Sequence, residues 1–413
     1  MPVKDREKVS SNSRETVNNP TADRLILALM ELWEYHSHSE ISVRMITNKA
    51  EASVSAIDYH FNGLEQLFCA AQDVALAQAS EWMDEVLSHL LPFGGARLET
   101  PAITTLFASL VDDWTERKRH LALAWREAHA ACLRPEFAHP HAEWCRLWAS
   151  FWDRFSKLTD GQHSVELLML FFDGEASQHL IRSHRLLDRA LLDETVGALF
   201  LFALNGAPAS SQIRVAHQGR AEAEYRHSFT AGTGDDRLDQ VAATILSDEG
   251  LSALTFRAVA QRADSTLGAV SYHFGSKATM LRLALQQIYE NSAGHSTLEF
   301  IESFPASASA LLDTVVEAVS NGQAPVLRAM DEITLTLSRS GDHGALGGVI
   351  RSFRDPVGLA ILNRLLGDPA HTSVALAAAF SSCVRGYGHF CSGIPSETCG
   401  PLGKNALSIF LKH

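Results

Sequence analysis

The side chains best placed for recognition chemistry lie in the run from Thr266 to Lys277, which reads TLGAVSYHFGSK. A short helix is predicted after Thr266, because a hydroxyl at a helix start accepts a hydrogen bond from the backbone. Val270 and Phe274 are four residues apart and therefore share the face that packs inward. The opposite face is small and polar, and Gly268 has no side chain to keep a partner away. This face is typical of a contact surface and not of a core.

Two further helices are needed to position this face. Residues 254–263 predict a helix with Thr255 as its cap, and only Asp264 and Ser265 connect it to the next helix. A connection this short is compatible with a helix-turn-helix. Apolar residues at helical spacing between Leu238 and Leu246 predict one more helix upstream. Three short helices, the third with a small polar outer face, form a DNA-reading module.

These residues resemble the N-terminal domain of the TetR family of transcriptional repressors. The resemblance is clearest in the run Tyr272-His273-Phe274-Gly275-Ser276-Lys277. It implies an all-α fold, in which a DNA-binding module is followed by a helical ligand-binding and dimerisation domain. In this chain Asp264 stands where the family usually has a turn glycine.

The module occurs a second time, earlier in the chain. Residues 59–61 repeat the Tyr-His-Phe of residues 272–274 at an offset of 213, and the same offset places Arg44 on Arg257. Hydroxyl caps are also paired, with Ser42 on Thr255 and Ser53 on Thr266. A repeat of this length indicates a duplicated domain. The first copy has Ser55 in place of Gly268 and Leu64 in place of Lys277, which predicts a weaker grip on DNA.

The chain is therefore expected to hold two TetR-like subunits. The expected divisions are a disordered arm (1–20), a first helix-turn-helix domain (21–66), a first helical ligand-binding and dimerisation domain (67–205), a linker rich in Gly, Ser and Ala (206–234), a second helix-turn-helix domain (235–280) and a second helical ligand-binding and dimerisation domain (281–413). A glycine-rich loop is expected at 341–348. By the resemblance, helices near 165–172 and 196–204 should pack against 359–366 and 374–384 as an intrachain dimer bundle; further pairing of two chains stays open.

The resemblance also implies a set of DNA contacts. Phosphate contacts are expected from Ser42, Tyr59, His60, Thr255, Tyr272, His273 and Lys277. Base edges should meet Ser55, Ala56, Asp58, Gly268, Ala269 and Ser271. The flanking Arg44 and Arg257 and the caps Ser53 and Thr266 complete the expected interface.

Composition agrees with an intracellular regulator. The net charge of −13 argues weakly against nucleic acid, but basic residues gather in the second module. Six cysteines without a CxxC pair indicate free thiols in a reducing cytosol. The longest apolar run, Val196–Leu204, is too short to span a bilayer. We therefore expect a cytoplasmic protein without a membrane partner.

An aromatic stripe in the first half predicts a ligand pocket. All seven tryptophans lie there, and Trp144, Trp148 and Trp152 follow helical spacing. By the resemblance this helix lines the inducer cavity, and aromatic walls suit a flat apolar ligand. Ordinary core packing is the alternative. The expected ligand-binding set is Trp114, His120, Trp125, Arg126, His129, Trp144, Cys145, Trp148 and Trp152.

The sequence gives less support to metal binding and catalysis than to DNA and ligand binding. His36-x-His38 and His139-x-His141-x-Glu143 place their residues at alternating positions, which do not share a helix face. Among 19 histidines such pairs arise by chance. No GxSxG, HExxH, GxGxxG or Walker loop occurs. We expect no metal, no cofactor and no enzyme activity.

The leading hypothesis is a transcriptional repressor that acts as a covalent pseudo-dimer on an imperfect palindromic operator. A small, mainly apolar or aromatic inducer would release it from DNA. The alternative is a protein-interaction scaffold whose modules no longer read DNA. Salt-dependent DNA binding would separate the two. An all-helical enzyme would require turnover, for which no residue set is visible.

Overall fold

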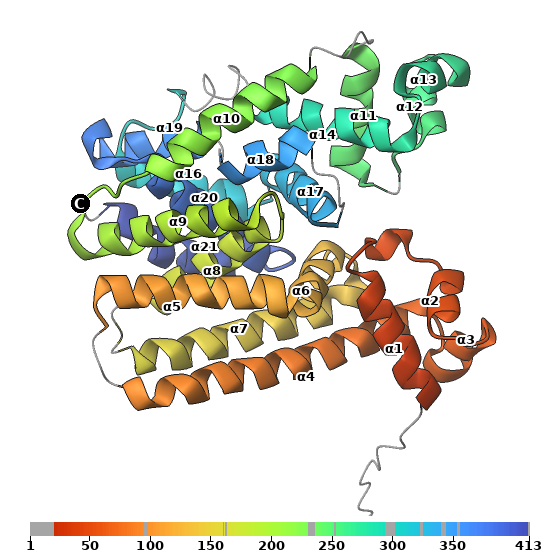
Figure 1. Cartoon of the computed structure of the whole chain (residues 1–413), viewed down its shortest axis with the longest axis horizontal. Helices are drawn as coiled ribbons and strands as arrows, with labels where there is room; N and C mark the ends of the chain where they lie inside the picture. Colours follow the sequence, from red (N-terminus) through yellow and green to blue (C-terminus); the bar gives the residue numbers. More distant parts are fainter. Residues whose placement is uncertain are drawn as a thin grey trace, which may run out of the picture.

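The computed structural model describes residues 20–94, 98–159, 161, 163–229, 236–251, 253–293, 302–322, 325–339, 344–352 and 356–411. Every regular element in these ranges is a helix, which confirms the all-α prediction (Figure 1). The expected arm lies outside the described residues except for Pro20, and so do residues 230–234 of the expected linker.

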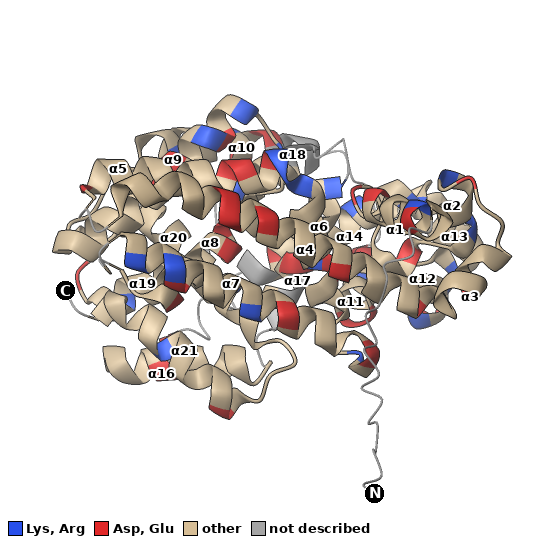
Figure 2. Ribbon diagram, turned by 90° about the horizontal axis from the view of Figure 1, so that it is seen from below, with Lys and Arg blue, Asp and Glu red and all other residues tan. Residues whose placement is uncertain are grey.

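Two three-helix units lie at the same end of the molecule (Figures 1 and 2). The first three-helix unit consists of α1 (Pro20–Leu32), α2 (Val43–Lys49) and α3 (Ser55–Phe61). The second three-helix unit consists of α11 (Asp236–Glu249), α12 (Phe256–Arg262) and α13 (Leu267–Phe274).

The two units share their turn geometry. Glu51 and Asp264 both have φ near 49°, a left-handed conformation that is uncommon for residues other than glycine. After the third helix of each unit, Asn62 (φ 57°) and Gly275 (φ 67°) again take positive values. Both pairs are 213 residues apart, the same offset as the sequence repeat. The backbone therefore repeats even where the side chains differ.

Long helices continue from each unit. The first unit is followed by α4 (Leu64–Leu90), α5 (Thr100–Asp112), α6 (Arg119–Ala131), α7 (Ala138–Leu158), α8 (Val165–His179) and α9 (Arg185–Asn205). The second is followed by α14 (Lys277–Ala293), α16 (Ala308–Ser320), α17 (Pro325–Arg339), α18 (Gly344–Ser352), α19 (Pro356–Leu366), α20 (Val374–Cys391) and α21 (Ser396–Leu407).

Two segments differ from expectation. The expected linker is largely a helix, α10 (Gln212–Phe229), which packs against α9 and α18. Its Arg214 is fully buried and donates to the carbonyl oxygens of Leu191 and Arg351, at 3.2 Å each. The described part of the expected glycine-rich loop belongs to α18, where Gly348 lies against α10. Tertiary packing thus stabilises helices in sequences rich in Gly, Ser and Ala.

The two halves meet where α8 crosses α20. A Cβ atom on Gly174 would lie 2.7 Å from the carbonyl carbon of Ser382, and one on Gly386 would lie 2.8 Å from that of Leu170. Residues 174 and 386, and likewise 170 and 382, are 212 positions apart. Each helix therefore places a glycine against the corresponding backbone position of the other.

Three of the four helices expected in the bundle are in contact in the structure. The α20 helix packs against both α8 and α9. The α19 helix packs instead on α16 and α20, and α21 takes a place against α8. No sequence pattern had predicted α21, whose run contains Pro401.

Candidate nucleic-acid interface and buried polar cluster

The α13 helix has the cap and the buried residues that the sequence predicts. Thr266 accepts a hydrogen bond from the backbone N–H of Ala269 at 3.1 Å. Val270 and Phe274 are buried in the core of the unit, while Tyr272 is 93% exposed. The expected contact residues that are exposed in this unit are Thr255, Arg257, Thr266, Gly268, Ala269, Ser271, Tyr272 and Lys277.

His273 does not fit its expected role as a phosphate contact. Its Nε2 lies 2.8 Å from a carboxylate oxygen of Asp239 on α11, and its side chain is only 10% exposed. The ring therefore ties the recognition helix to the first helix of the unit.

The cations in and beside this unit differ in their partners. Arg262 pairs with Glu249 at 2.6 Å, and Arg237 donates to the carbonyl oxygen of Ala263. Arg257 and Lys277 are exposed and have no ion-pair partner among the described residues. Arg257 on α12 and Lys277 at the start of α14 flank α13 in the chain.

The first three-helix unit presents a different face. Ser53 does not cap α3, because its hydroxyl lies 3.1 Å from that of Ser55 and Val54 occupies the cap position. Ala56 is buried, so it is not available for the expected base contact. Tyr59 is 83% exposed and matches Tyr272 in position. Of the remaining expected contacts, Ser42, Arg44, Ser53, Ser55 and Asp58 are exposed and His60 is half-buried.

The tryptophan stripe lies in the core. Trp144, Trp148 and Trp152 are fully buried on α7, and the ring of Trp148 packs edge-on against Trp114 with 5.0 Å between centroids. Trp144 donates from Nε1 to Gln72 at 2.8 Å. The core alternative therefore describes these rings, because α7 packs between α4 and α8. His120 and Cys145 are half-buried.

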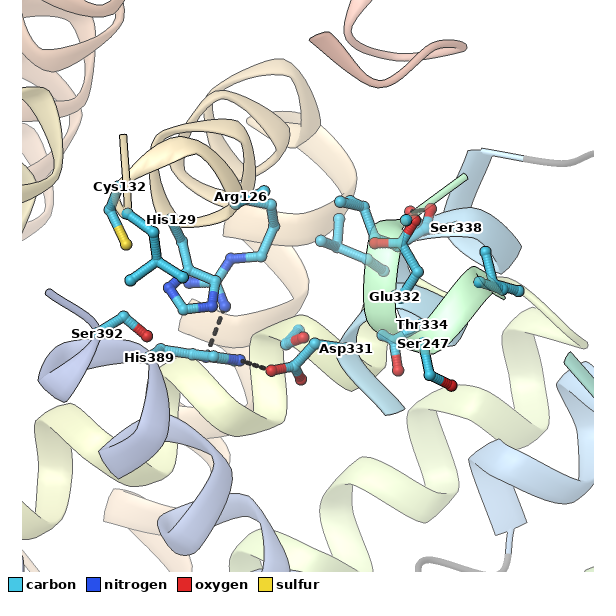
Figure 3. Close-up of a pocket in the computed structure, with 17 residues that line it drawn as sticks. Arg126, His129, Cys132, Ser247, Asp331, Glu332, Thr334, Ser338, His389 and Ser392 are labelled. Atoms are coloured by element: carbon cyan, nitrogen blue, oxygen red, sulfur yellow. Dashed lines mark hydrogen bonds and ion pairs between the residues drawn. The ribbon is translucent and has the colours of Figure 1, made fainter. Parts of the chain in front are cut away.

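Two cavities lie at the junction of the two halves, and Figure 3 shows the smaller one. One of about 200 Å³ is lined by residues of α6, α8, α11, α17 and α20. A neighbouring one of about 570 Å³ touches residues 35–40, α6, α17 and the end of α11. Arg126 and His129 are the members of the expected ligand-binding set that line the smaller cavity, and no tryptophan lines either one.

A buried polar cluster forms one wall of the smaller cavity. Asp173 on α8 pairs with Arg126 on α6 and accepts a hydrogen bond from Nε1 of Trp125. His389 on α20 lies between two carboxylates, with Nδ1 at 2.5 Å from Asp173 and Nε2 at 3.1 Å from Asp331 on α17.

The cluster lowers the pKa of both carboxylates, Asp173 and Asp331, which favours their ionised forms. Burial alone would raise the pKa of Asp173, but the charges of Arg126 and His389 outweigh it and lower that pKa. Burial likewise disfavours a charged His389, yet the neighbouring Asp331 raises its pKa. The sequence did not single out Asp173, Asp331 or His389, since no local motif links them.

Metal-ligating atoms come together in the same place. His129, Asp331 and His389 each offer one ligand atom, and all three atoms lie within 4.8 Å of one another. His129, Cys132 and His141 form a second such group. Of the sequence pairs considered for metal, only His141 belongs to either group.

The comparisons with known proteins agree with the geometry of the second unit. Residues 240–284 match the family model for bacterial regulatory proteins of the tetR family. This segment contains the whole of α12 and α13 and the start of α14. A search of curated proteins gave no match. No helix in the described ranges has the length and apolarity to cross a bilayer. Residues 240–284 thus resemble a TetR-type DNA-binding domain.

Proposed function

We propose that this protein is a transcriptional repressor that binds DNA as a covalent pseudo-dimer. Both recognition helices would enter successive major grooves of an imperfect palindrome. The observation that carries this proposal is the position of the two units at one end of the molecule (Figures 1 and 2). Their repeated turn geometry and the reciprocal glycine contacts of α8 and α20 support it.

Release from DNA would act through the junction cavities. The smaller cavity is walled by Leu246, Ser247 and Gly250 of the second unit and by residues of the first half. An effector bound there would shift the spacing of the two readers if it binds one spacing more tightly than the other. The lining includes Arg126, His129 and Asp331, which favours a polar or charged effector over the apolar inducer expected from the sequence.

A footprint on DNA from the protein's own genomic neighbourhood tests the proposal. We expect a protected site with two half-sites about one helical turn apart, and affinity that falls steeply with salt. A single half-site would contradict the pseudo-dimer. Absence of salt-dependent binding would favour the alternative of a protein-interaction scaffold.

A further inference from the structure

Three helices from both halves bring potential metal ligands to one point. His129 comes from α6, Asp331 from α17 and His389 from α20. Their ligand atoms lie within 4.8 Å of one another on the wall of the smaller junction cavity (Figure 3). Two imidazoles and one carboxylate are ligands that divalent transition metals such as Zn²⁺ and Co²⁺ accept. Three protein ligands also leave a coordination position open towards the cavity.

The ring of His389 is already oriented for coordination. Its Nδ1 faces the carboxylate of Asp173 at 2.5 Å and the guanidinium of Arg126 at 2.6 Å, which leaves Nε2 directed towards Asp331. In metal sites a carboxylate commonly holds the far nitrogen of a ligating histidine in this way. Arg385 donates to one oxygen of Asp331 at 3.2 Å, so the other oxygen faces His389.

His129 supplies an independent observation. Its Nδ1 is buried and has no hydrogen-bond partner among the described residues. A buried polar atom without a partner is costly, and coordination to an ion would remove that cost. The ring lies against that of His389, with 4.6 Å between centroids.

We propose that His129, Asp331 and His389 bind one divalent transition-metal ion that joins the two halves of the chain. The adjacent Glu332 lines the same cavity. The second group is less suited, because Nε2 of His141 is already hydrogen-bonded to the carbonyl oxygen of His389 at 3.0 Å.

The ion would act on the second three-helix unit. Helix α17 packs against α11 and α14, so an ion that fixes α17 to α6 would restrain that unit relative to the first half. This regulatory consequence rests on the proposed function, whereas the binding site does not.

The site is tested on the untagged full-length protein after treatment with a chelator. Titration with Co²⁺ should produce a saturable visible d–d absorption, and Zn²⁺ should displace it. His129→Gln and Asp331→Asn should each weaken binding by at least about ten-fold. His139→Gln is the control, because that side chain is 73% exposed and lies in neither group, and its binding should be unchanged.

Circular dichroism of each variant separates loss of the site from loss of the fold. If the wild type binds neither Co²⁺ nor Zn²⁺ saturably, the proposal is overturned. It is also overturned if Cys132→Ser abolishes binding while Asp331→Asn preserves it, since the ion would then belong to the second group. Because the readout needs no DNA, its failure is distinct from failure of the proposed function.

Discussion

Two tyrosines at equivalent positions protrude from the recognition helices. Tyr59 is 83% and Tyr272 is 93% exposed, so neither ring gains much from packing within its unit. A phenol exposed in this way can donate a hydrogen bond to a phosphate oxygen. The residues around the two rings differ, however, and only the second unit has the adjacent lysine.

Lys277 should contribute to DNA affinity through charge alone. Lys277→Ala should weaken binding to all sequences alike and reduce the salt slope by about one unit, because one fewer counterion is released. The measurement is affinity at several salt concentrations. Lys404→Ala is the matched control, since Lys404 lies on α21 and pairs with Asp313. An unchanged salt slope would show that Lys277 does not contact the DNA.

His163 should make the fold sensitive to acid. Burial lowers its pKa to about 4, and its ring lies 4.8 Å from that of Phe200. In the unfolded chain His163 is protonated near the ordinary histidine pKa of about 6.5. The free energy of unfolding is therefore unaffected by His163 above that pH, and it falls as the pH drops towards 4.

His163→Gln should therefore lose less stability than the wild type between pH 7.5 and pH 5, by up to about 2 kcal/mol. Urea unfolding at both pH values measures the difference. His184→Gln, at an exposed position, should follow the wild type. If the free energy of unfolding changed equally with pH in all three proteins, His163 would not be the cause of the acid sensitivity.

At the scale of the element, the crossing of α8 and α20 depends on two glycines. Gly174 and Gly386 each face the backbone of the other helix, so a Cβ at either position forces the helices apart. The adjoining side chains are buried almost all round both helices, which leaves little room for adjustment.

Gly174→Ala should destabilise the protein by about 3 kcal/mol, the upper part of the usual range for overpacking. Gly386→Ala should destabilise the protein by about as much, because Gly386 faces the backbone of α8 as Gly174 faces that of α20. Gly219→Ala on α10 is the control: a Cβ there meets nothing within 4 Å, and alanine favours the helix. Thermal unfolding of the three variants tests this. A loss for Gly219→Ala as large as that for Gly174→Ala would point to glycine content and not to the crossing.

On the scale of the whole molecule, the proposed pseudo-dimer has two unlike readers. The second unit presents an exposed Ala269 and Ser271, while the first has a buried Ala56 and an exposed Asp58. A carboxylate repels phosphate and can accept only from a base amino group such as that of cytosine. The half-site of the first unit should therefore differ in sequence and contribute less affinity.

Scrambling each half-site in turn measures the two contributions. Scrambling the half-site of the second unit should reduce DNA affinity more than scrambling the half-site of the first unit. The half-site of the second unit is the one whose scrambling makes DNA affinity insensitive to Lys277→Ala. Equal costs with identical half-site preferences would show that the readers are equivalent.

The sequence by itself predicted most of the helices and the helix-turn-helix of the second three-helix unit, but not α10, α18 or α21. Caps such as Thr255 and Thr266 and the spacing of Val270 and Phe274 are local signals, and local backbone physics is enough to interpret them. The repeat at offset 213 is read by comparing two distant segments of the chain. The same signals predicted a cavity wall at the tryptophans, where the structure has closely packed, buried rings. An aromatic stripe at helical spacing identifies the buried face of α7, but it does not distinguish a core from a cavity wall.

Only the tertiary structure decided which faces meet. Arg126 and His389 are 263 residues apart, yet they share one buried cluster because α6, α8, α17 and α20 converge there. Buried charges lie together only where their partners compensate desolvation, and those partners depend on how helices pair in space. The reciprocal contacts of Gly174 and Gly386 have the same origin. The periodicity of apolar residues shows that one face of a helix is apolar, but how closely another helix approaches that face depends on which helix covers it.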